Sequence, residues 1–96
     1  MLLLHSRLMA QNSPNPFNPV TTIRYEQKEA GAVTLRIYDV MGQQVRSLVD
    51  ALQSSGRHQV RWEGRDERGA PVANGVYFYE LRVGEFRALR KMILMK

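Results

Sequence analysis

Few residues in this chain have the types and spacing that metal or cofactor chemistry requires. The chain holds two histidines, His5 and His58, which lie far apart, and neither neighbours a His, Glu or Asp at ligand spacing. A thiolate zinc site is excluded because there is no cysteine. We therefore expect neither a metal nor a cofactor, and we expect His58 to begin a strand near the rim of the fold.

A nucleophilic site has one weak candidate. Ser54, Ser55 and His58 are close in sequence, but the Gly-x-Ser-x-Gly pattern that exposes a catalytic serine does not surround them. No phosphate-binding loop is present either, because Gly69 and Gly75 have neither the required spacing nor a following helix. We therefore expect that the chain is not an enzyme.

The acidic cluster Glu63, Asp66 and Glu67 could serve glycoside hydrolysis or calcium binding, but a turn is the simpler interpretation. It lies at the end of an expected strand, and the alternating acids of a calcium loop are absent. Asp66 followed by Gly69 is typical of a turn in which the aspartate carboxylate accepts backbone N–H groups. We expect that role for Asp66.

Two aromatic positions could bind a partner. Trp62 is in phase with Val60 on an expected strand, which favours a core role. Tyr77, Phe78 and Tyr79 follow one another, so one face of their strand must expose aromatic side chains. For Tyr77, coverage of a sheet edge and contact with a partner both remain open.

Composition is that of one folded domain of 96 residues with a net charge of +5. The arginines are dispersed over expected strands and turns, which favours solvated strand faces over a nucleic-acid footprint.

No segment reaches the ~18 apolar residues of a membrane span. The apolar start at residues 1–4 is interrupted at His5, so we expect no export signal here. Residues 1–11 are expected to be a leader or the remnant of an upstream linker, and residues 12–96 the domain.

Alternation of apolar and polar residues predicts strands over residues 21–26, 33–37, 43–49, 58–62, 76–83 and 86–95. Asp39 and Gly42 predict a tight turn, and a bulge is expected in its hairpin because Val45, Leu48 and Val49 do not share one parity. Short strands with no credible long helix predict an all-β sandwich. The expected core is Ile23, Val33, Leu35, Ile37, Val60, Trp62, Tyr79, Leu81, Met92 and Leu94.

The segment before the first of these strands is unusual, because prolines alternate with asparagines around one phenylalanine. Its residues are Pro14, Asn15, Pro16, Phe17, Asn18 and Pro19. Proline removes an N–H donor and fixes φ, which excludes a helix interior or a central strand. Asparagine side chains here could close turns on the following backbone. We expect a stiff, extended lead-in with Phe17 as an apolar anchor.

Taken in order, the motifs resemble the C-terminal sorting domains of the type IX secretion system, which are similar to the immunoglobulin-like domain of the flagellar hook-capping protein. The likeness covers about residues 11–96. It comprises the Pro-Asn segment, Asp39 and Gly42, Trp62, Asp66 and Gly69, then Gly75, Val76 and Tyr77, and finally Lys91. Gly75, Val76 and Tyr77 match the Gly-x-Tyr signal strand of the family, and Lys91 matches its terminal basic motif.

The resemblance implies a seven-stranded immunoglobulin-like antiparallel β-sandwich that acts as a non-enzymatic address tag. It implies a secreted or cell-surface location reached through the periplasm, with a cargo domain attached on the N-terminal side. The implied partners are the outer-membrane translocon and a sortase-like peptidase. We expect docking through the final strands, residues 75–96, where an exposed edge strand could add to a partner sheet. A structural role remains the alternative, either of hook-cap type or as a packing or spacer domain of a larger extracellular enzyme.

Overall fold

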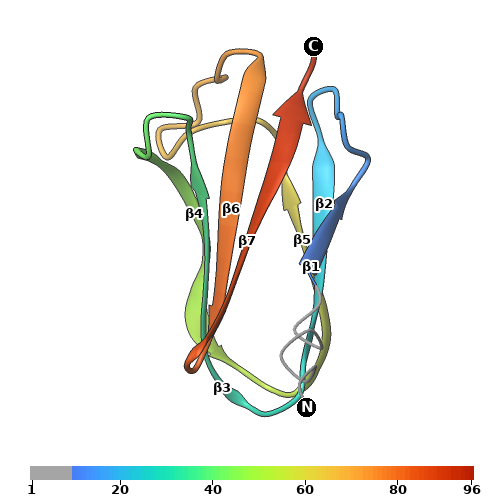
Figure 1. The fold of residues 1–96 in the computed structure, drawn as a ribbon, viewed down its shortest axis with the longest axis vertical. Coiled ribbons are helices and arrows are strands. Elements are labelled where there is room, and N and C mark those ends of the chain that lie inside the picture. Colours follow the sequence, from blue (N-terminus) through green and yellow to red (C-terminus); the bar gives the residue numbers. More distant parts are fainter. Residues whose placement is uncertain (1–9) are drawn as a thin grey trace.

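The computed structural model describes residues 10–96, which form seven strands in two antiparallel sheets with overall dimensions of 39 × 25 × 23 Å. Figure 1 shows the two layers. The three-stranded sheet has the order β1 (Ala10–Ser13), β2 (Thr21–Gln27), β5 (Gly56–Trp62). The four-stranded sheet has the order β4 (Gln44–Gln53), β3 (Gly31–Tyr38), β6 (Gly75–Val83), β7 (Phe86–Leu94). The predicted all-β sandwich is therefore confirmed, and no helix in the described part of the chain could span a membrane.

The core lies between the two sheets, where every second side chain of the facing strands points inward. All but one of the predicted core residues are buried. The exception is Val60, which is only half-buried although it packs against the core. It lies on β5, which has no neighbouring strand on its outer side within residues 10–96, so one flank of the side chain meets solvent.

The strand β1 is the element that alternation did not predict. Residues 10–11 were assigned to a leader, but Ala10 is buried and pairs with Tyr25 of β2, so the folded domain begins at least two residues earlier than expected. Four residues are too few for a period-2 pattern to stand out, and only one of them is apolar. The expectations for residues 1–4 and for His5 lie outside the described residues.

The hairpin from β3 to β4 carries the bulge that the mixed parity of β4 predicted. The register between these strands shifts twice, between Leu35 and Arg36 and between Ile37 and Tyr38. A bulge places two residues of one strand opposite one residue of the other, so the side chains before and after it can face the same sheet surface. Val49 is buried for this reason, while Val45 and Leu48 pack partly against the core.

Candidate recognition surface

The Pro-Asn segment forms neither a helix nor a central strand, as predicted, and it lies against the free edge of the last strand. The Phe17 N–H donates to the Ile93 carbonyl at 3.0 Å, and the Met95 N–H donates to the Phe17 carbonyl at 2.9 Å. Asn15 Oδ1 accepts the Ile93 N–H at 3.0 Å, and its Nδ2 donates to the Lys91 carbonyl at 3.4 Å. Asn15 thus bonds to β7 and not to the backbone that follows it, which corrects that part of the expectation.

Three aromatic rings from distant parts of the sequence meet inside the sandwich. The ring centres of Phe17 and Trp62 are 5.7 Å apart, and those of Trp62 and Tyr77 are 5.5 Å apart in an edge-to-face arrangement. The Trp62 Nε1–H donates to the Arg65 carbonyl at 2.9 Å, so its polar group is satisfied although the ring is buried. The core role predicted for Trp62 is confirmed, and Phe17 anchors its segment as expected.

Tyr77 belongs to this core as well, which neither of the two open interpretations anticipated. The side chain is 6% exposed, and its hydroxyl donates to the Ala73 carbonyl at 2.6 Å. Burial, with a smaller contribution from the negative charge of Asp39, raises the pKa of Tyr77 above 10.0. The inward parity of Tyr77 with Tyr79 on β6 is the sequence signal that could have found this position.

Two aspartate turns with the same geometry close loops of the sandwich. Asp39 Oδ1 accepts N–H groups from Met41 and Gln43, two and four residues further on, at 2.9 and 3.0 Å. Asp66 Oδ1 accepts from residues 68 and 70, at 2.9 and 3.0 Å. In each turn the glycine three residues after the aspartate has positive φ, 81° at Gly42 and 85° at Gly69. The turn role predicted for Asp66 is confirmed, and within residues 10–96 no cluster of acids and histidines could hold a metal.

The remaining signal candidates have two different roles in the fold. Gly75 matters for its backbone conformation, whereas Val76 and Lys91 lie on the surface of the sheet. Gly75 begins β6 with φ of 145°, a conformation that side chains disfavour. Val76 and Lys91 point away from the core, because their neighbours Tyr77 and Met92 are buried. Of the matched signal strand, only Val76 therefore offers its side chain to a partner.

The outer face of the four-stranded sheet has an apolar end and a charged end. Its apolar end consists of the half-buried residues Tyr38, Val76, Phe78 and Ile93, and register places Lys91 directly opposite Phe78. Further along the strands, Glu80 forms ion pairs with Arg87 at 2.9 Å and with Arg82 at 3.3 Å. We call this surface the β6–β7 face.

The edge of the last strand is less available than the sequence suggested. β6 is a central strand, and β7 is covered along residues 91–95 by the Pro-Asn segment. Addition of a partner strand at this stretch would require Phe17 and Asn15 to leave. The β6–β7 face is consequently the accessible part of residues 75–96.

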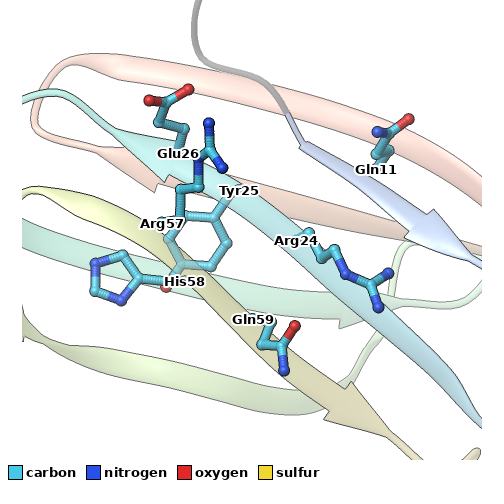
Figure 2. Close-up of a pocket in the computed structure, with 7 residues that line it drawn as sticks. All are labelled: Gln11, Arg24, Tyr25, Glu26, Arg57, His58 and Gln59. Carbon is cyan, nitrogen blue, oxygen red and sulfur yellow. The ribbon is translucent and has the colours of Figure 1, made fainter.

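A shallow groove of about 440 Å³ lies on the other sheet, and apart from Tyr25 the residues that line it have charged, amide or imidazole side chains. Figure 2 shows the side chains that form it, which are Gln11, Arg24, Tyr25, Glu26, Arg57, His58 and Gln59. His58 stacks on Tyr25 with ring centres 5.4 Å apart, and its Nε2 lies 2.9 Å from the Ser54 carbonyl oxygen. His58 therefore contacts a backbone carbonyl where a catalytic base would need a hydroxyl. No sequence pattern indicated this groove, because its side chains come from three different strands.

These features define the chain as an immunoglobulin-like β-sandwich whose sequence motifs gather at one end of the fold. A family model for the FlgD Ig-like domain matches residues 17–84, and the chain belongs to this family. A search of curated proteins found no match.

Solved structures with the same fold include chains of PorU, PorZ and FlgD. Dimeric latent PorU from Porphyromonas gingivalis superposes with a TM-score of 0.70 at 21% identity, over 90% of this chain. PorZ from the same organism is described as an essential bacterial surface component of the type IX secretion system. It superposes with a TM-score of 0.61 at 23% identity, over 91% of this chain. FlgD from Xanthomonas campestris is described in connection with hook capping in flagellar assembly. It superposes with a TM-score of 0.61 at 22% identity, over 82% of this chain. The chain spans 9% of PorU, 11% of PorZ and 58% of that FlgD chain.

Proposed function

We propose that this chain is the C-terminal sorting domain of a secreted or cell-surface protein, recognised by the outer-membrane machinery of type IX secretion. The observation that carries the proposal is the ordered set of motifs from Pro14 to Lys91 on a sandwich that belongs to the FlgD Ig-like family. The occurrence of the same fold as a small part of PorU and PorZ supports it. In this proposal the partners are the translocon, a sortase-like peptidase and an N-terminal cargo domain.

Recognition in this proposal uses the β6–β7 face. Phe78 and Ile93 supply apolar contact area, and the ammonium group of Lys91 lies beside them for an acidic group of the partner. Gly75 and Tyr77 act indirectly, because they set the start of β6 and hold it against the core. No catalytic step belongs to this function, and hydrolase assays of the purified chain should find no activity that depends on Ser54 or Glu63.

Transplantation tests the sorting function. Residues 10–96 are fused behind a reporter with an export signal, in a host that has this secretion system, and the reporter is located by fractionation. We expect it at the cell surface or in the medium. A reporter that stays in the periplasm would refute sorting.

A matched pair of variants then tests the face. Lys91→Glu should reduce export, whereas Lys28→Glu, which makes the same charge change on the exposed turn after β2, should not. Equal export of both variants would refute the role of the β6–β7 face while leaving sorting itself intact.

A structural role of hook-cap type is the second candidate, and the family match favours it directly. The test replaces the Ig-like domain of a flagellar FlgD with residues 10–96 and measures motility in a strain that lacks FlgD. Restored swimming supports assembly. Paralysed cells with a stably folded chimaera count against it.

A further inference from the structure

The outer edge of β5 is open and regular along its whole length. All seven residues of β5 pair with β2 in one unbroken register, from Thr21 opposite Trp62 to Gln27 opposite Gly56. No other strand of residues 10–96 pairs with β5, so half of its backbone N–H and C=O groups face outward. Such a row is a template for an added strand.

The other three edges of the sandwich are shortened or covered. β1 has only four residues. β7 is covered over residues 91–95 by Phe17 and Asn15, and β4 carries register shifts in its hairpin. Near the start of β4 two outward groups are also used, since the Glu67 N–H donates to the Val45 carbonyl at 3.2 Å and its carboxylate accepts the Ser47 N–H. Among the strands of residues 10–96, β5 alone combines length, regular pairing and a side that is open from end to end.

The side chains along β5 give this edge a positive outer face. Arg57, Gln59 and Arg61 alternate on it and are exposed, and Arg24 of β2 lies opposite Gln59. Within residues 10–96 none of these three arginines forms an ion pair, although Glu26 lies opposite Arg57 in the register. On the inner side of the strand, His58 and Val60 are half-buried.

This charge pattern opposes pairing of β5 with β5 of a second copy. In an antiparallel dimer with full overlap, Gln59 would face its own equivalent, and Arg57 would face Arg61 at two places. Like charges directly opposite each other destabilise a strand pair. A partner strand with acidic residues at the same spacing would instead place opposite charges at these positions, which stabilises a strand pair.

We propose that the β5 edge binds an extended acidic segment of another protein, which adds to the three-stranded sheet as a fourth strand. Its alternate Asp or Glu side chains lie beside Arg57 and Arg61, and the residues between them are apolar and lie next to Val60. The groove in Figure 2 borders the same edge, and Arg24, Arg57 and Gln59 all line it. This interaction does not depend on the sorting function, because it uses the opposite sheet from the β6–β7 face.

A labelled nine-residue peptide of alternating Glu and Val, binding to the full chain, is the probe. We expect saturable binding by fluorescence anisotropy that weakens as salt rises, and amide shift changes centred on residues 56–62 in NMR spectra. Two N-methylated peptides report the strand geometry, since methyl groups on one set of alternate nitrogens should abolish binding and those on the other set should not. Amide shift changes centred on β7, or equal effects of both methylation patterns, would overturn the proposal. So would a peptide that an oligonucleotide displaces and that still binds after either methylation.

Charge reversal gives the matched control. Arg57→Glu/Arg61→Glu should weaken binding of the Glu peptide by about tenfold or more and should create binding of a Lys–Val peptide. Arg68→Glu/Lys96→Glu carries the same change in charge away from β5 and should leave Glu-peptide binding within about twofold once salt is matched. Both pairs lie on exposed positions, so thermal melts should show folded proteins. Equal weakening by the two double variants would overturn strand addition at β5.

Discussion

Phe17→Ala is the change that most directly tests how the Pro-Asn segment holds the sandwich together. The side chain is 2% exposed, so nearly all of its area, about 200 Å² for a phenylalanine, leaves water on folding. At about 25 cal/mol per Å² this corresponds to at most about 5 kcal/mol, and measured truncations of buried phenylalanine cost about 3–5 kcal/mol. A domain of this size is stable by roughly 5–14 kcal/mol, so the variant should lose a large part of its free energy of unfolding.

Urea denaturation followed by tryptophan fluorescence measures this loss, because Trp62 is the only tryptophan and lies 5.7 Å from the Phe17 ring. Phe17→Leu serves as the control, since it retains most of the apolar volume and should cost less than about 2 kcal/mol. Hydrogen exchange of the Met95 and Ile93 amides should accelerate in the alanine variant before exchange in β3 does, because Phe17 and Asn15 are their acceptors. A loss below about 1 kcal/mol for Phe17→Ala, or unchanged exchange at those amides, would refute the anchoring role.

Four further changes have expected outcomes. Trp62→Ala should cost about 3–5 kcal/mol in urea melts, and a cost below about 1 would contradict its core position. Asp66→Ala should cost about 1–2 kcal/mol because two N–H groups lose their acceptor, whereas Asp66→Asn should retain most of the stability. Gly64→Ala should cost about 1–2 kcal/mol, since φ is +71° and a Cβ would meet the Pro19 carbonyl at 3.2 Å; an unchanged melt would contradict this contact. Burial raises the pKa of Tyr79 from 10.0 to about 12, so the folded state holds this proton more tightly, and stability that is complete below pH 10 should fall by about 1–3 kcal/mol towards pH 12. Tyr79→Phe should flatten that part of the pH profile, and an unchanged slope would contradict the shift.

Sequence alternation predicted most of this architecture because the strands are long and one face of each is buried. β3 and β6 illustrate this, since their inward residues Leu35, Ile37, Tyr79 and Leu81 are apolar and recur at every second position. The two aspartate turns were predictable for a related reason: their hydrogen bonds connect residues at most four positions apart. Local chemistry is visible in a single sequence.

Contacts between distant segments account for what the sequence did not predict. The bridge between Phe17 and the end of β7 joins residues more than seventy positions apart, and no pattern within either segment specifies the other. The open edge of β5 is a property of sheet order, which strand periodicity does not contain. The expectation for Val60 was wrong for the same reason, because its exposure depends on the absence of a strand on the outer side of β5 within residues 10–96.

The location of the family motifs constrains how any partner can use them. Phe17, Trp62 and Tyr77 are buried together, and Gly75 serves backbone geometry, so a folded domain cannot present these residues to a receptor. Their substitution should impair recognition only as far as it unfolds the domain or shifts β6 and β7. Surface substitutions on the β6–β7 face should instead impair recognition at unchanged stability. Measuring export and the free energy of unfolding for the same variants therefore separates a motif that maintains the fold from a surface that a partner contacts.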